Sequence, residues 1–178
     1  MRVIGGEFRS RRIKAVPGLA TRPTPDRLRE TLFDILAPRI EGAVFVDAYA
    51  GTGAVGIEAL SRGAARVIFL ERDRRALAVL RENLAMLEIR ERAVIVPGPV
   101  VPNLNRRSAD IVFLDPPYDV QREYRSALEA LAAIAAPLVI AQHSVHFTLP
   151  ERSGALARYR QLRQGDNVLS FYSPEAVP

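Results

Sequence analysis

The sequence predicts an α/β protein, built as a doubly wound, mostly parallel sheet that ends in an antiparallel β-hairpin. Three observations lead to this fold class. Short apolar runs alternate with helical stretches from residue 43 onward, a glycine-rich turn follows the first run, and the last two runs lie four residues apart. A chain of 178 residues suits a single compact domain, since domains run to about 100–200 residues.

Five apolar runs of strand length make up the alternating part of the chain. Helical stretches separate them, for example residues 73–88 and 121–134, where leucines recur at helical spacing. A further helix is expected near the N-terminus, with Thr24 as its N-cap and Pro25 as its first residue. Because strands connected by helices form parallel sheets covered on both faces, we expect parallel strands at Ala43–Asp47, Arg66–Glu71, Ala93–Pro97, Asp110–Asp115 and Leu138–Gln142.

The C-terminal part of the chain breaks this alternation. The runs Leu156–Arg163 and Val168–Ser173 are joined by Gln164-Gly165-Asp166-Asn167, which leaves no room for a helix. Strands connected by so short a loop pair antiparallel. These residues therefore predict a hairpin that closes the sheet.

Basic residues are concentrated at the N-terminus. The net charge is +5, and residues 1–40 hold nine basic and four acidic side chains, so the excess charge lies there. Residues 1–25 are interpreted as a basic arm that turns at Gly5-Gly6, ahead of a domain that spans residues 26–178. Such an arm either binds an anionic polymer such as RNA or is a solvated tail. The candidate RNA contacts are Arg2, Arg9, Arg11, Arg12, Lys14 and Arg22.

Composition excludes several classes of protein and site. The chain has no cysteine, so disulfides, thiolate metal sites and a cysteine nucleophile are ruled out. No run approaches the roughly 18 apolar residues of a membrane span, and the first residues do not resemble a signal peptide. His143 and His146 lack a nearby third ligand and are interpreted as loop residues. We expect a cytoplasmic monomer without a metal or a membrane partner.

The glycine-rich turn has the pattern G-x-G-x-x-G. Gly51, Gly53 and Gly56 follow the first predicted strand and open a helix, and Glu71 lies twenty residues past Gly51 at the end of the next strand. This context is typical of a nucleotide-type ligand, whose ribose hydroxyls donate to an acidic residue such as Glu71. Lone matches to the pattern are often no more than tight turns.

A carboxylate in front of the glycines narrows the choice of ligand. Asp47 ends the first strand, where an anion repels the pyrophosphate of a dinucleotide but attracts the cationic amino-acid end of S-adenosylmethionine. Tyr49 either borders this cofactor or packs against the protein, and Arg72 either reaches toward it or is a solvated helix start. The full set of candidate cofactor contacts is Asp47, Tyr49, Gly51, Thr52, Gly53, Glu71, Arg72, Gly98 and Pro99. We expect a bulky residue at position 53 to abolish cofactor binding while the fold survives.

The fourth strand leads into Asp115-Pro116-Pro117-Tyr118. Ligands of open α/β sheets bind outside the carboxyl ends of the strands, so Asp115 shares an edge with Asp47 and Glu71. The two prolines stiffen the turn. An Asp115 carboxylate and a Pro116 carbonyl that each accept one N–H direct the nitrogen lone pair of a nucleobase amine outward, and Tyr118 stacks on the base. The candidate catalytic residues are Asp115, Pro116 and Tyr118.

Together these motifs resemble the bacterial 16S ribosomal RNA guanine-N2 methyltransferases of RsmD type. The matching stretches are RVIGGEFR at residues 2–9, RPTPDRLRETLF at 22–33, AGTGAVGIEALSRG at 50–63 and VFLDPPY at 112–118. The resemblance implies a Rossmann-like class I methyltransferase that uses S-adenosylmethionine. It also implies one guanine of 16S rRNA as the substrate, in an assembled or assembling 30S subunit that the basic arm contacts.

The chain departs from the family pattern at two places. Relatives usually carry an Asp or Asn in the loop after the third strand, where this chain has Pro97-Gly98-Pro99. They often have a Glu after the fifth strand, where this chain has Gln142-His143. Two other functions stay open from the residues: a nicotinamide-dependent oxidoreductase on the same glycine loop, which leaves Asp47 unexplained, and a non-catalytic RNA-binding module, which leaves the acidic groups at the sheet edge unexplained.

Overall fold

A computed structural model describes residues 1–16, 25–106, 108–117 and 121–174. The strands in this part of the chain form one sheet in the order β3-β2-β1-β4-β5-β8-β7-β6. They are β1 (Val44–Ala48), β2 (Arg66–Glu71), β3 (Ala93–Pro97), β4 (Ile111–Leu114), β5 (Val139–Ser144), β6 (Arg152–Ser153), β7 (Leu156–Gln164) and β8 (Asn167–Pro174). β1 to β5 are parallel to one another, and β8 pairs antiparallel with both β5 and β7.

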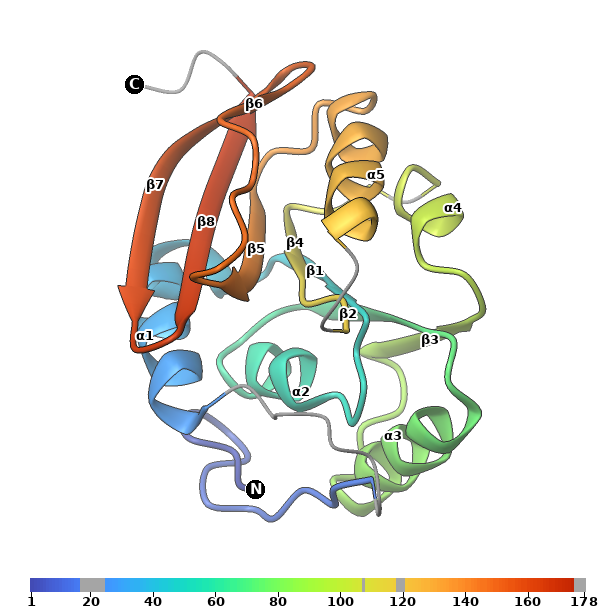
Figure 1. The fold of residues 1–178 in the computed structure, drawn as a ribbon. Coiled ribbons are helices and arrows are strands. Elements are labelled where there is room, and N and C mark those ends of the chain that lie inside the picture. Colours follow the sequence, from blue (N-terminus) through green and yellow to red (C-terminus); the bar gives the residue numbers. More distant parts are fainter. Residues whose placement is uncertain (17–24, 107, 118–120, 175–178) are drawn as a thin grey trace.

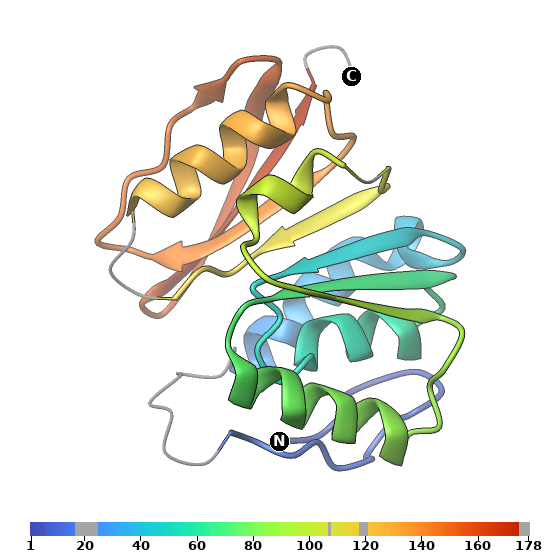
Figure 2. The same cartoon turned by 90° about the vertical axis from the view of Figure 1, so that its right-hand side faces the viewer.

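Helices cover both faces of the sheet (Figures 1 and 2). One face packs against α1 (Asp26–Ile40), α2 (Ala54–Ser61) and α3 (Arg74–Met86), and the other against α4 (Val101–Leu104) and α5 (Gln121–Ala132). The alternating side chains of the strands therefore fill two separate apolar cores. This arrangement accounts for the continuous apolar runs in the sequence.

The strand order changes direction between β1 and β4, which are neighbours in the sheet although β2 and β3 lie between them in sequence. In open α/β sheets, ligands bind beyond the carboxyl ends of the strands at such a switch point. The register places Asp47 beside Phe113 and Leu114 beside Ala141. The segments that follow β1, β4 and β5 consequently emerge at one edge of the sheet, where Figure 2 shows the arrows of β4 and β5 pointing to the same side.

The predicted fold class, the five parallel strands and the closing hairpin are confirmed. The start of the first helix differs, since α1 begins at Asp26 with Pro25 as the preceding cap residue, and Thr24 lies outside the described residues. Two short elements had no sequence signal. α4 has four residues and β6 has two, too few for a periodic pattern to show.

The described part of the N-terminal arm lies against the body of the protein. Val3, Phe8 and Ile13 are buried and belong to the same core as α1, α2 and α3. A bridge joins Arg2 to Arg12, and turns and bends run from Gly5 to Ser10, so the reversal is wider than the predicted one at Gly5-Gly6. Apolar side chains spaced along the segment explain why it packs on the domain.

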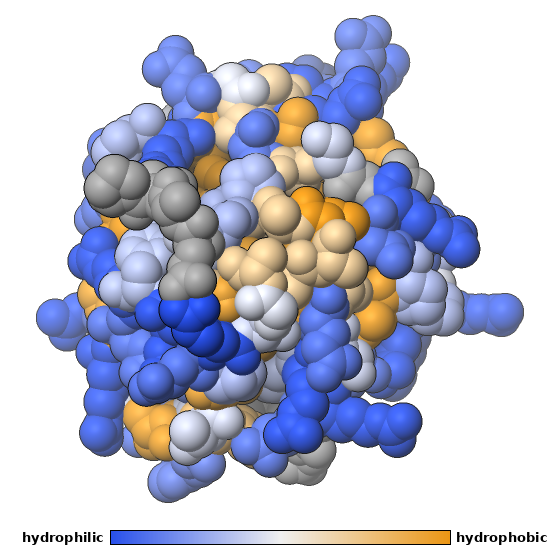
Figure 3. All heavy atoms as spheres, turned by 90° about the horizontal axis from the view of Figure 1, so that it is seen from above, coloured by the Kyte–Doolittle hydropathy of each residue, from blue (hydrophilic) through white to orange (hydrophobic). Residues whose placement is uncertain are grey.

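Hydrophilic side chains ring a smaller apolar area on the face seen from above in Figure 3. In the described ranges the large apolar side chains that stay exposed are Met86, Ile134 and Tyr159. Within the same ranges no helix has the length and apolar character required to cross a membrane.

Candidate cofactor and substrate site

The glycine loop connects β1 to α2 and takes its shape from backbone conformations that favour glycine. Gly51 and Gly53 have φ values of 56° and 81°, a region that other residues rarely adopt. A Cβ at Gly56 would lie 2.3 Å from Cε1 of Phe69, so the third glycine allows α2 to pack closely on the sheet. The loop thus has the conformation and packing that the fingerprint predicts.

Gly53 has a role in packing that the sequence did not reveal. A Cβ there would lie 2.3 Å from Cδ1 of Leu80, a core residue of α3. The expectation that a bulky residue at position 53 leaves the fold intact is therefore wrong, because it clashes within the core. Gly51 is the better probe of the loop, since a Cβ added at Gly51 would meet no other atom within 4 Å.

Asp47 is buried at the end of β1, with 2% of its surface exposed. Its Oδ2 accepts the backbone N–H of Gly56 at 2.8 Å, which ties the strand to the start of α2. Burial raises the pKa of Asp47 well above its usual value, and the nearby charges of Asp115 and Glu71 raise it further. A cation bound beside Asp47 would favour the ionised form.

Glu71 joins the end of β2 to the glycine loop. Its Oε2 accepts the N–H of Gly51 at 2.7 Å, and its Oε1 accepts the N–H groups of Arg72 and Asp73. A carboxylate offers about four acceptor positions, so these bonds leave capacity for a hydroxyl donor. The described geometry thus places Glu71 as a support of the loop, and its predicted contact to a ribose stays a prediction.

Tyr49 sits between Asp47 and Gly51 in a strained backbone conformation, with φ at 65°. Its hydroxyl donates to Oε2 of Glu123 on α5 at 2.7 Å. Burial, followed by the bond and the charge of Glu123, raises the pKa of the Tyr49 hydroxyl. Tyr49 therefore packs against α5 through a bond that the sequence did not predict.

The remaining cofactor candidates lie around the same loop. Gly98 has a φ of 122° with open space at its Cβ position, and the carbonyl of Pro99 accepts a hydrogen bond from Nδ2 of Asn103 at 2.8 Å. Arg72 is exposed at the end of β2.

The carbonyl of Thr52 accepts a hydrogen bond from Nδ2 of Asn83, a fully buried residue of α3. Sequence patterns do not reveal Asn83 or Asn103, because single polar residues within helical stretches have no distinct signal.

The Asp-Pro-Pro turn follows β4 at the same edge of the sheet. Asp115 is half-buried and its backbone N–H donates to the carbonyl of Ala48, while Pro116 is buried. Tyr118 lies outside the described residues.

The register that pairs Leu114 with Ala141 brings Gln142 beside Asp115. Gln142 is 2% exposed, and within the described ranges its Oε1 has no hydrogen-bond partner.

The arm cations Arg2, Arg9, Arg11, Arg12 and Lys14 are all exposed, and Arg22 lies outside the described residues. Buried polar side chains of α2 and α3 hold the described part of the arm in place through its backbone. Glu58 accepts the N–H groups of Ile4 and Gly5 at 2.8 Å, and the side-chain amide of Asn83 accepts the backbone N–H of Lys14 and donates to its carbonyl. The described part of the arm is thus held on the body of the protein with its cations exposed, although Lys14 pairs with Glu82 and Arg11 donates to the carbonyl of Met86.

His143 is buried on β5, where its Nε2 lies 2.8 Å from Oγ of Ser170. Burial lowers the pKa of its imidazole, which favours the neutral ring. Among the described residues no group of three His, Cys, Asp or Glu side chains has the arrangement of a metal site. His143 is a hydrogen-bonded core residue rather than the loop residue expected from the sequence.

The sequence profile of the family described as "Conserved hypothetical protein 95" matches residues 1–173. The chain belongs to this family. It is 35% identical to "Ribosomal RNA small subunit methyltransferase D" of Escherichia coli K12, over 99% of the chain and 91% of that protein. The solved structure of "Putative methyltransferase yhhF from Escherichia coli" superimposes with a TM-score of 0.82 at 35% identity, with 99% of each chain covered.

The fold is that of the class I methyltransferases, for which S-adenosylmethionine is the methyl donor. An RNA methyltransferase from Salinibacter ruber, solved in complex with S-adenosyl-L-homocysteine, shares the fold with a TM-score of 0.69 and 19% identity, over 88% of this chain and 96% of that one. The predicted cofactor class therefore agrees with the fold of this family.

Proposed function

We propose that the protein transfers a methyl group from S-adenosylmethionine to the exocyclic N2 amine of one guanine in 16S rRNA, in an assembled or assembling 30S subunit. The observation that carries this proposal is the Asp115-Pro116 turn at the switch point of the sheet. It occurs in a chain that matches a small-subunit rRNA methyltransferase over nearly its whole length. The exposed cations of the N-terminal arm support an RNA substrate.

The residues at the carboxyl edge of the sheet fit S-adenosylmethionine. Open space at Gly51 allows close approach of a ligand to the backbone. Asp47 is a buried carboxylate with two acidic neighbours, so a cationic amino group stabilises it in its ionised form. In our proposal Asp47 lies near the amino-acid end of the cofactor, Gly51 and Gly53 along its length, and Glu71 at its ribose.

The cofactor supplies a methyl group on a positively charged sulfur. In the proposed reaction the Asp115 carboxylate and the Pro116 carbonyl each accept one N–H of the guanine amine. These two bonds orient the nitrogen lone pair along the line of attack, which lowers the entropic part of the barrier. As the N–C bond forms and the C–S bond breaks, the amine becomes acidic and loses one proton toward Asp115. We assign the stacking contact with the base to Tyr118.

The product identifies the reaction. Unmodified 30S subunits and protein-free 16S rRNA are incubated with methyl-labelled cofactor, and the RNA is digested to nucleosides. We expect labelled N2-methylguanosine. Label in a ribose, a ring nitrogen or a carbon-methylated base would contradict the assignment of the amine. The yields from the two substrates show which assembly stage the enzyme prefers.

Calorimetry separates the alternative functions. We expect S-adenosylmethionine to bind and NAD not to bind. Binding of NAD in place of S-adenosylmethionine would favour an oxidoreductase, and binding of RNA with neither cofactor would favour a non-catalytic module. Light scattering during the same titration tests the predicted monomer.

A further inference from the structure

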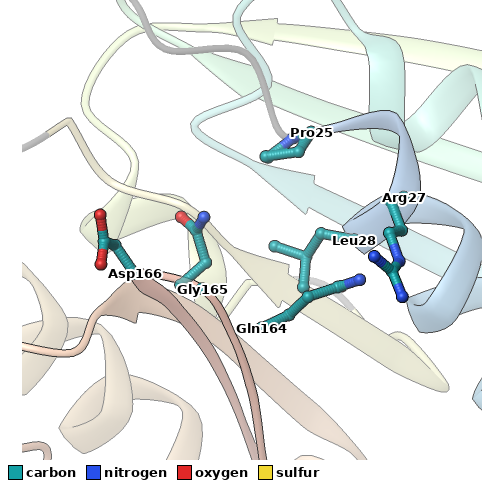
Figure 4. Close-up of a pocket in the computed structure, with 7 residues that line it drawn as sticks. Pro25, Arg27, Leu28, Gln164, Gly165 and Asp166 are labelled. Atoms are coloured by element: carbon teal, nitrogen blue, oxygen red, sulfur yellow. The ribbon is translucent and has the colours of Figure 1, made fainter.

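A cavity of about 360 Å³ lies between the start of α1 and the turn that joins β7 to β8 (Figure 4). Its lining combines polar and apolar groups and consists of Pro25, Arg27, Leu28, Gln164, Gly165, Asp166 and Asn167. The pocket is open to solvent rather than enclosed, and its volume lies near the lower end of the range for small-molecule pockets, roughly 300–1,000 Å³. None of these residues belongs to the proposed cofactor or catalytic groups.

The cavity shares the edge of the sheet with the Asp-Pro-Pro turn. Asn167 pairs with Ser144, the last residue of β5, and β5 pairs with β4, which leads into Asp115. Neighbouring strands lie about 4.8 Å apart, so β8 is displaced from β4 by roughly 10 Å. A ligand in the cavity therefore lies beside the site proposed for the target base.

Gln164 brings a buried acceptor to this pocket, and Asp166 adds a solvent-exposed carboxylate at the turn. The Oε1 atom of Gln164 is buried and has no hydrogen-bond partner among the described residues. In Figure 4 the Gln164 side chain extends from the turn toward α1, and the Asp166 carboxylate lies on the same turn. An unsatisfied buried acceptor is costly. Gln164 lines the pocket, so a ligand that presents N–H groups, as amino-bearing nucleobases do, satisfies this acceptor once the Gln164 amide turns toward it.

One arginine lines this pocket, and two others lie on the adjoining part of β7. Arg27 lines it directly, and Arg163 lies one residue before the turn, with its Nε donating to the carbonyl of Gly165. Arg160 lies over the ring of Phe171, and the exposed Tyr159 lies against the same ring. Within the described ranges, no ion pair is formed by Arg27, Arg160 or Arg163. Guanidinium groups placed in this way complement a chain of phosphates.

We infer that this cavity and the carboxyl half of β7 bind the single-stranded rRNA next to the target guanine. One flanking base enters the cavity and donates to Gln164, while Arg27 and Arg163 contact phosphates. The assignment rests on the proposed function, because it takes RNA as the substrate. It adds a second RNA surface to the one proposed for the N-terminal arm.

The first test measures the salt dependence of binding to a short single-stranded oligoribonucleotide with one guanine. For single strands the slope of log K against log salt changes by about 0.7 for each phosphate contact. The double variant Arg27→Ala, Arg163→Ala should lower the slope by about 1.4. Arg66→Ala is the matched control. Arg66 is an exposed arginine at the amino end of β2, on the edge of the sheet opposite to the proposed site. An unchanged slope in the double variant, or an equal fall in the control, overturns the inference.

The second test addresses the base in the cavity. Gln164→Leu should weaken binding of the normal oligonucleotide several-fold and leave unchanged the affinity for one with abasic residues beside the guanine. Equal loss for both RNAs would refute a base contact. Unaltered cofactor affinity verifies that each variant is folded.

Kinetics on 30S subunits separate this inference from the proposed function. We expect the variants to raise KM for the subunit, with kcat and the labelled nucleoside unchanged. If wild type produces N2-methylguanosine but the variants keep the wild-type KM and salt slope, the cavity is not an RNA site and the function stands. If the product differs while the variants raise KM, the RNA surface stands and the amine assignment fails. A ribosomal protein captured at the cavity without any RNA effect would also refute the inference.

Discussion

At the scale of single residues, the buried carboxylate of Asp47 links cofactor binding to pH. Its pKa is raised in the folded protein because burial penalises the charged form. A nearby cation lowers that pKa again, so binding of S-adenosylmethionine releases a proton in the window between the two pKa values. We expect cofactor affinity to increase with pH through this window and then level off. Calorimetry in buffers of different ionisation enthalpy measures the released proton.

The Asp47→Asn variant is the control for this linkage, and it should bind the cofactor without proton release. The same pKa shift affects stability. Folded Asp47 keeps its proton to higher pH than the unfolded residue, whose pKa is about 3.9, so its contribution to stability falls as pH rises from there through the folded pKa. Wild-type affinity that does not depend on pH would contradict the assignment of Asp47.

Asp115 belongs to the chemical step in our proposal. Asp115→Ala removes one of two acceptors for the amine, and loss of a positioned acid–base group typically costs about 10²–10⁴ in rate. We expect that fall in kcat with cofactor affinity retained. Asp110→Ala is the control, because Asp110 is the same residue type just before the other end of β4 and bonds to the backbone of Val44. Similar rates for the two variants would exclude Asp115 from catalysis.

At the scale of elements, the N-terminal segment is held by a buried ionic group on α2. Glu58 is fully buried, lies 2.9 Å from Arg62 and 3.7 Å from the buried Arg29, and accepts two backbone N–H groups of the segment. Removal of one partner from a buried pair costs about 3–5 kcal/mol. We expect Glu58→Ala to lose that much free energy of unfolding, measured by urea denaturation, and Glu58→Gln to lose less.

Asn83 of α3 connects two elements with different proposed roles. Its amide bonds the backbone of Lys14 in the arm and the carbonyl of Thr52 in the glycine loop. Asn83→Asp keeps the acceptor for the Lys14 N–H but replaces the donor to the carbonyls of Lys14 and Thr52 with a carboxylate oxygen. We expect cofactor affinity to fall several-fold in calorimetry. Glu82→Ala, which removes an exposed ion pair to the same Lys14, should leave affinity unchanged, and equal effects would argue against a tie to the loop.

At the scale of the whole molecule, the described part of the basic arm packs on α2 and α3, while the β7–β8 hairpin follows β5 in the sheet, on the other side of β5 from β4 (Figure 1). In our proposal the RNA contacts both surfaces. The triple variant Arg9→Ala, Arg11→Ala, Arg12→Ala should lower the salt slope of RNA binding by about 2, at roughly 0.7 per contact. Cofactor affinity should not change. A slope equal to that of wild type would leave the arm without an electrostatic role.

The sequence by itself determined the α/β class, the parallel strands, the closing hairpin and the glycine loop, because these depend on local patterns. Apolar runs, helical spacing and short loops each act over a few residues. The order of Asp47, Gly51, Glu71 and Asp115 along the chain also placed them at one edge, since the carboxyl ends of parallel strands share an edge.

The tertiary structure decided how distant residues meet. Glu58, Asn83 and Gln142 lie in ordinary helical or strand patterns, and their importance arises from partners or neighbours far along the chain. The clash at Gly53 with Leu80 and the cavity beside Gln164 follow from packing between elements. Such contacts depend on the position of each element in space, which the local periodicity of a sequence does not encode.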